Sequence, residues 1–161
     1  MGAAATPATR ALDAAGVAYA LHTFTHDPAS DGFGPEAVEA LGVDGARVLK
    51  TLVAVTADGG LVLGVLPVPE LLDLKRLAAA VGAKRAALAG VRVAERATGY
   101  VHGGISPFGQ RRRLPAVVDA TAATHERVIV NAGRRGLQAE LAPADLIALT
   151  DAKVATIARG R

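Results

Sequence analysis

The sequence predicts a mixed α/β fold in which a mixed, largely antiparallel sheet, or a partly closed barrel, packs against helices. Three observations lead to this prediction. Helix and strand patterns interleave along the 161 residues, and 51% of the residues are hydrophobic, which is ample for one core. A turn signal at 57–60 joins two apolar runs as a hairpin, which disfavours a doubly wound parallel sheet. We expect a single domain over residues 1–161.

The first elements are bounded by residues that typically start and stop helices. A helix follows the N-cap Thr6 and ends at Gly16. Residues 17–24 alternate between apolar and polar positions, as a half-buried strand does. A second helix begins at Pro35 and ends at Gly42.

Two strands come next, over 48–56 and 61–68, connected by Ala57-Asp58-Gly59-Gly60. The later elements follow the same reasoning of periodicity and turn residues. They are, in order, an amphipathic helix in 71–82, a weaker helix in 91–99, a loop rich in glycine and arginine over 100–115, short strands in 115–120, 127–133 and 137–141, a helix in 143–150, and a last strand in 154–158.

Composition excludes several classes of site. The chain has no cysteine, so it has no disulfide, thiolate metal site or cysteine nucleophile. His22 and His26 lie in a strand that runs into a turn, where their spacing separates them by roughly 13 Å. With two serines and four scattered histidines, neither a catalytic triad nor a metal site assembles, so we expect no metal and no cofactor. No signal peptide or membrane-length apolar run is present, which indicates a cytoplasmic protein with no membrane partner.

Basic residues are clustered beside glycine-rich stretches. The formal net charge is +3, and an arginine run at 111–113 and an arginine pair at 134–135 follow the two glycine loops. Such clusters suit an anionic ligand, and they are equally typical of a solvated charged face.

Lys50 and the glycine loops are the strongest local candidates for a site. Lys50 interrupts an apolar strand, so its ammonium either reaches solvent at the sheet margin or enters a cavity to meet an anionic or carbonyl ligand. The glycines at 103–104 and 133 form ordinary turns or present N–H groups to an oxygen. Gly104-Ile105-Ser106 begins like the G-x-S-x-G elbow of a serine hydrolase, but Phe108 stands where its second glycine is required.

Several segments taken together carry a resemblance to a known family. They are TPATRALDAAGV, LHTFTHDP, FGPEAVEALGV, VLKTLV, LDLKRLAAAVGAKRA, ATGYVHGGISPFGQRRRLP and AGRRGLQAELAPADL. In this order and spacing they resemble the YbaK/EbsC family of free-standing aminoacyl-tRNA deacylases. That family is similar to the editing domain of bacterial prolyl-tRNA synthetase. The resemblance implies an enzyme that removes cysteine mischarged on tRNA(Pro), with the acceptor end of that tRNA and prolyl-tRNA synthetase as partners.

The resemblance also implies roles for individual residues. Lys50 would orient the terminal adenosine or its phosphate, and Gly104 with neighbouring amides would hold the ester carbonyl. The substrate's own thiol would attack the ester, which fits a chain without a triad. The residues expected to bind the aminoacyl substrate are Phe24, Phe33, Gly103, Ile105, Ser106, Pro107, Asn131 and Gly133. Those expected to contact the tRNA are Arg111, Arg112, Arg113, Arg134 and Arg135.

Three positions depart from the family pattern. Some members carry tyrosine where this chain has Phe24, members commonly carry serine at Asn131, and a small apolar residue is usual at His102. These departures leave two alternatives open, a deacylase for another small amino acid such as alanine, and a binding module without turnover. If water attacks instead of a substrate thiol, His102 is a candidate base.

Overall fold

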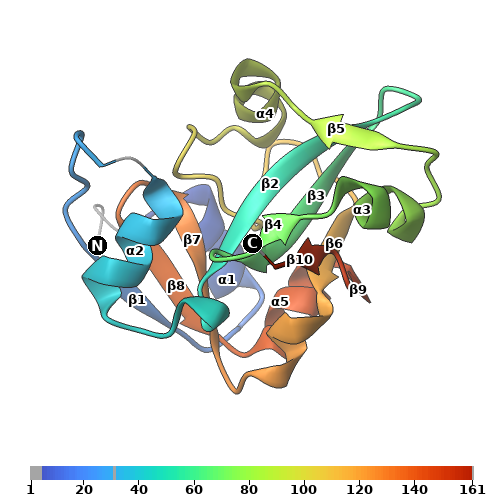
Figure 1. Cartoon of the computed structure of the whole chain (residues 1–161). Helices are drawn as coiled ribbons and strands as arrows, with labels where there is room; N and C mark the ends of the chain where they lie inside the picture. Colours follow the sequence, from blue (N-terminus) through green and yellow to red (C-terminus); the bar gives the residue numbers. More distant parts are fainter. Residues whose placement is uncertain (1–4, 31, 161) are drawn as a thin grey trace.

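The computed structural model describes residues 5–30 and 32–160 (Figure 1). Its α-helices are α1 (Pro7–Ala14), α2 (Phe33–Leu41), α3 (Leu74–Ala80), α4 (Val91–Thr98) and α5 (Pro143–Thr150). Its strands are β1 (Tyr19–Thr23), β2 (Leu49–Thr56), β3 (Leu61–Pro67), β4 (Leu71–Leu72), β5 (Ala86–Leu88), β6 (Ala116–Asp119), β7 (Val128–Arg134), β8 (Leu137–Leu141), β9 (Lys153–Ala155) and β10 (Ala158–Arg159). None of the described helices is long and apolar enough to cross a membrane.

Two main sheets organise the chain. One has the strand order β5-β2-β3-β6-β9, with antiparallel pairs on both sides of β2 and parallel pairs on both sides of β6. The other has the order β1-β8-β7 and is antiparallel throughout. A single parallel bridge between Val48 and Ile129 joins the two sheets. The prediction of mixed, largely antiparallel sheets with packed helices is therefore confirmed, and the sheets do not close into a barrel.

Most elements begin and end for the reasons that the sequence supplies. The Thr6 side chain accepts a hydrogen bond from the N–H of Thr9 and caps α1, and Asp73 caps α3 in the same way through the N–H of Arg76. The hairpin between β2 and β3 turns at Gly59, whose φ is +89°. α2 begins at Phe33, two residues before the predicted start at Pro35. The helix accommodates Pro35 in its first turn because N–H groups there have no intrahelical partner to lose.

The main core fills the space between the two sheets and is closed by α1 and α5. Val65 and Val118 contribute from the larger sheet, and Val130 and Leu137 contribute from the smaller one. The loop over 100–115 is part of this core, because Tyr100 and Phe108 are both almost fully buried in it. The Tyr100 hydroxyl donates to the Phe108 carbonyl, and burial raises the pKa of Tyr100 to about 12. The loop is thus held in place by packing, which positions its glycines.

Candidate active site

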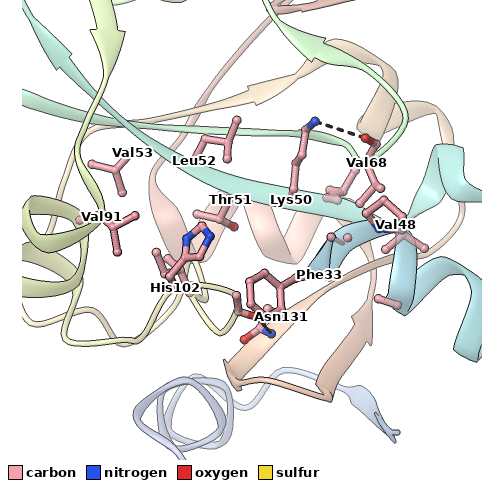
Figure 2. A pocket seen from close by; sticks show the side chains of 18 of the residues that line it. Phe33, Val48, Lys50, Thr51, Leu52, Val53, Val68, Val91, His102 and Asn131 are labelled. Carbon is pink, nitrogen blue, oxygen red and sulfur yellow. Dashed lines mark hydrogen bonds between the residues drawn. The ribbon is translucent and has the colours of Figure 1, made fainter. Parts of the chain in front are cut away.

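A cavity of about 430 Å³ lies where the two sheets separate. α2, β2, α4, the loop at 102–105, β7 and β8 all contribute to its lining (Figure 2). The walls are mainly apolar, with Val53, Ala94 and Ile105 on one side and Ala37 and Val68 on another. A mostly apolar cavity with a few polar groups is the usual form of a small-molecule site.

The cavity runs along an edge of β2 that has no ladder partner between its two ends. At one end the Val53 carbonyl accepts a hydrogen bond from the N–H of Ala89, at 2.9 Å, and at the other end Val48 bridges Ile129. Main-chain groups alternate between the two sides of a strand. Thr51, two residues before Val53, therefore directs its N–H and C=O toward the same open side. Its hydroxyl is buried and has no hydrogen-bond partner within the described ranges.

Lys50 borders the cavity at the end near Val68. Successive residues of a strand point to opposite faces, so Lys50 and Thr51 leave β2 on opposite sides (Figure 2). The Lys50 ammonium donates to the carbonyl of Val68 at 3.2 Å and to that of Glu70 at 2.6 Å. The lysine expected to serve the substrate thus also fixes the turn after β3.

Two N–H groups of the glycine loop remain available to a ligand, and the N–H of Gly104 is not one of them. The N–H of Gly104 donates to the Val101 carbonyl at 2.8 Å, and the N–H of His102 donates to Glu95 Oε2 at 2.8 Å. Gly103 and Ile105 both line the cavity, and their N–H groups have no hydrogen-bond partner among residues 5–30 and 32–160. Gly104 is buried and does not line the cavity, whereas its two neighbours do. That amides of this loop hold the ester carbonyl stays a prediction.

Asn131 holds the glycine loop against the turn between β7 and β8. Its Nδ2 donates to the carbonyl of Gly103 at 3.3 Å and to that of Arg134 at 3.0 Å. Its Oδ1 accepts from the N–H of Gly133 at 2.6 Å. Asn131 lines the cavity, whereas Gly133 lies behind it, near Thr6 and Tyr100. These three hydrogen bonds occupy the side-chain amide of Asn131. The residue therefore acts as a clamp between the glycine loop and the turn after β7.

The mouth of the cavity is built around the ring of Phe33. The Phe33 ring lies 5.0 Å from the ring of His26 and 5.2 Å, edge-on, from the ring of His102. The guanidinium of Arg135 lies 5.0 Å from the Phe33 centroid, and its Nε donates to the His102 carbonyl at 2.9 Å. The pKa of Glu36 is lowered by two hydrogen bonds to its carboxylate, of which the bond with His26 has the larger effect and the bond from the N–H of Asp27 the smaller. The mouth therefore combines aromatic faces with a fixed positive charge.

Other expected site residues lie elsewhere. Phe24 lines an adjacent hollow beside α2, which shares Gly32 and Pro35 with the cavity. Pro107 lines a third hollow, which shares no lining residue with the cavity. Ser106 is fully buried, and its Oγ accepts from the N–H of Phe108 at 3.2 Å. The Arg111–Arg113 run is exposed, and Arg113 borders the same hollow as Pro107. Phe33, Lys50, Gly103, Ile105 and Asn131 are thus the expected substrate residues that the fold brings together.

The fold adds polar residues that sequence reasoning missed. Thr51 and Gln138 both line the cavity, and Gln138 is only 6% exposed. Both residues could have been found by the pattern that singled out Lys50, which is a polar side chain inside an otherwise apolar strand. No group of histidine and acidic residues that could hold a metal ion occurs in the part of the chain that the structure describes.

Comparisons with known proteins indicate a family and a fold. A model of the family described as "Aminoacyl-tRNA editing domain" matches residues 31–149. A protein of Enterococcus faecalis named "Putative Cys-tRNA(Pro)/Cys-tRNA(Cys) deacylase EbsC" is 40% identical over 119 residues, which are 74% of this chain and 73% of that protein. The solved structure described as "a putative trans-editing enzyme for prolyl tRNA synthetase" is 28% identical, with a TM-score of 0.80 over 97% of this chain and 99% of that one. A hypothetical protein of known structure is 25% identical, with a TM-score of 0.85 over 96% of this chain and 100% of the other.

Proposed function

We propose, from the premise that this chain belongs to the aminoacyl-tRNA editing domain family, that it removes cysteine mischarged on tRNA(Pro). Deacylation of aminoacyl-tRNA is the activity of the family. Cysteine on tRNA(Pro) is the finer assignment, and the printed name of the Enterococcus faecalis relative supports it. The observation that carries the proposal is that Gly103 and Ile105 line a mainly apolar cavity and that their N–H groups have no partner within the described ranges.

These two N–H groups suit the transition state of ester cleavage. Attack on an ester carbonyl moves negative charge onto its oxygen, and fixed donors that meet this charge lower the barrier. Gly103 and Ile105 are held in place by the clamp of Asn131 and by the buried loop that follows. In this arrangement the donors need no reorganisation when the charge develops.

The lining offers no activated hydroxyl or thiol, because the Thr51 hydroxyl has no hydrogen-bond partner in the described ranges and so no base to activate it. No serine is among the residues that line the cavity in the described ranges, and the chain has no cysteine. We therefore assign the attack to the substrate thiol. A bond forms between sulfur and the carbonyl carbon, the bond from that carbon to the ribose oxygen breaks, and the thiol proton passes to the ribose oxygen. The products are a cyclic thiolactone and free tRNA.

Partners follow from the same assignment. The acceptor end of tRNA(Pro) enters at the mouth, where Arg135 and Phe33 meet the terminal nucleotide, and Lys50 adds positive charge at the far end. Prolyl-tRNA synthetase is the partner that would identify the correct tRNA in a ternary complex. This chain then acts in trans, beside the synthetase that holds the tRNA in this complex.

Deacylation of a panel of proline tRNAs carrying cysteine, serine or alanine tests the proposal. We expect cysteine to be removed far faster than serine, because a hydroxyl is a much weaker nucleophile than a thiol at neutral pH. Thiolactone among the products supports thiol attack. Rapid removal of alanine with direct release of the amino acid would instead indicate an activated water, with His102 as its base. Binding of all three without cleavage would identify a binding module.

Replacing Ser106 with alanine should leave most of the activity and lower stability. The Ser106 hydroxyl is fully buried and contacts the N–H of Phe108, so its loss leaves a buried donor unpaired, at about 1–3 kcal/mol. Single-turnover deacylation and chemical denaturation of the same variant measure the two effects. Loss of activity in a well-folded variant would contradict the assignment of the attack to the substrate.

Neutralising Arg111, Arg112 and Arg113 should weaken tRNA binding and flatten its salt dependence. If each arginine meets one phosphate, the slope of log affinity against log salt should fall by roughly one unit per arginine. We expect KM to rise more than kcat falls, because these exposed residues lie apart from the cavity. Lys75, Lys84 and Arg85, which are also exposed, provide a control with the same charge change. Equal slopes for both triple variants would make the Arg111–Arg113 run a solvated surface.

A further inference from the structure

Gln138 is a buried amide that faces the cavity without a partner. It lies on β8, where it pairs with Asn131 of β7 on one side and with His22 of β1 on the other. The residue is 6% exposed and lines the cavity. Within the described ranges its side-chain amide makes no hydrogen bond, and its N and O atoms are not among the buried polar atoms sealed from solvent, so they reach the open space of the cavity.

The neighbours of Gln138 are already engaged. The Asn131 amide bonds the main chain of the glycine loop and of the turn after β7. The His22 ring bonds Glu140 at 2.7 Å. Rearranging either residue to serve Gln138 would break an existing contact. A bound ligand is therefore the natural partner of this amide.

The position of Gln138 identifies the part of the ligand it would meet. The ribose and base belong at the mouth, where His102 and Arg135 are exposed, whereas Gln138 is among the most buried lining residues. The ester oxygen belongs with the N–H groups of Gly103 and Ile105. What remains is the α-amino group, which needs acceptors. Gln138 Oε1 is such an acceptor, and the hydroxyl of Thr51, which has no partner within the described ranges, is a second acceptor in the lining.

We propose that Gln138 is a substrate-positioning residue that binds the α-amino group of the aminoacyl ester. This inference rests on the proposed function, because it takes an aminoacyl adenosine as the ligand. Gln138 holds the α-amino group in the buried part of the cavity and thereby turns the amino-acid side chain toward the apolar wall of Val53, Ala94 and Ile105. A neutral amide suits this task because it accepts from the amino group without adding a buried charge.

The test compares two amide-linked analogues that cannot be cleaved as the ester is. They are 3′-alanylamino-3′-deoxyadenosine and its 3′-propionylamino counterpart, which lacks only the α-amino group. We expect the wild-type protein to bind the first about 10-fold to 100-fold more tightly, and Gln138→Leu to bind both within about 3-fold of each other. Gln138→Glu keeps an acceptor and should retain the preference. Calorimetry measures all six affinities and does not depend on turnover.

Stability distinguishes this role from a structural one. Gln138→Leu replaces an unpaired buried amide by an apolar group, so its Tm should equal or exceed that of the wild type. Gln110→Leu is the matched control, because the Gln110 amide donates to the Ser106 carbonyl at 2.9 Å outside the cavity. This control should lower Tm and leave the preference for the amino analogue unchanged. An unchanged preference in Gln138→Leu, a lower Tm in that variant, or no wild-type preference would overturn the inference.

The same measurements separate the inference from the proposed function. If the wild-type protein prefers the amino analogue through Gln138 but cleaves none of the charged tRNAs, the positioning role stands and the deacylase assignment fails. If the tRNAs are cleaved and the preference is absent, the deacylase assignment stands and the role of Gln138 fails.

Discussion

Lys50→Ala should abolish deacylation while the protein remains folded. The Lys50 ammonium lies at one end of the cavity and holds the carbonyls of Val68 and Glu70. Removing it takes away a positive charge at the far end of the cavity and loosens the turn after β3. Misplacement of a substrate by 1 Å can lower a rate by about 100-fold, and we expect at least that loss in kcat/KM. Single-turnover deacylation of charged tRNA(Pro) measures it.

Two variants separate the charge of Lys50 from its contacts. Lys50→Arg keeps the charge but brings a planar fork into a site shaped for an ammonium, so we expect it to be poorly active as well. Lys153 also donates to a main-chain carbonyl, that of Ala80 at 3.3 Å, away from the cavity. Lys153→Ala should therefore keep wild-type activity. Wild-type turnover in a folded Lys50→Ala protein would remove this residue from the site.

Gly103→Ala should lower activity about as strongly, through the shape of the mouth. Gly103 has a φ of +85°, and a Cβ there would lie 2.5 Å from Cδ1 of Phe33. The ring cannot move without leaving its contacts with His26, His102 and Arg135. The clash would displace the N–H of Gly103, which we propose as a donor to the carbonyl oxygen, so we expect kcat/KM to fall by about 100-fold, as for the loss of an oxyanion donor.

The control for Gly103→Ala is a glycine with the same backbone strain and no neighbours. Gly82 has a φ of +74°, and a Cβ there would meet nothing within 4 Å. Both alanine variants should lose about 1–2 kcal/mol of stability from the left-handed backbone. Gly82→Ala should keep full activity. Equal activity in both variants, measured by deacylation beside chemical denaturation, would show that Gly103 does not shape the site.

Much of the architecture could be predicted from local patterns. The helices α1, α3, α4 and α5 and the hairpin of β2 and β3 follow from caps, apolar periodicity and turn residues near in the chain. The short strands β4, β5 and β10 escaped prediction. Each is two or three residues long and exists because a distant strand pairs with it, as β10 pairs with β4. A segment of that length has too little periodicity to reveal itself.

The candidate site divides in the same way. The order of motifs around Lys50 and the glycine loops was enough to indicate the family, and Phe33, Gly103, Ile105 and Asn131 do line one cavity with Lys50. The resemblance also implied Phe24, Ser106 and Pro107, and the fold places these three outside the lining of this cavity. In the fold, the burial of Phe108 and Tyr100 draws the second half of the loop into the core.

By itself, the sequence determined the family, the class of fold and the lysine and glycine positions that border the site. The tertiary structure alone decided which N–H groups of the glycine loop remain for a ligand, and that Gln138 faces the cavity. The physical reason is that a hydrogen-bonding group can bind a ligand only if no other group of the protein already bonds it. Those partners, such as Val101 for Gly104 and Gly103 for Asn131, are set by how the whole chain packs.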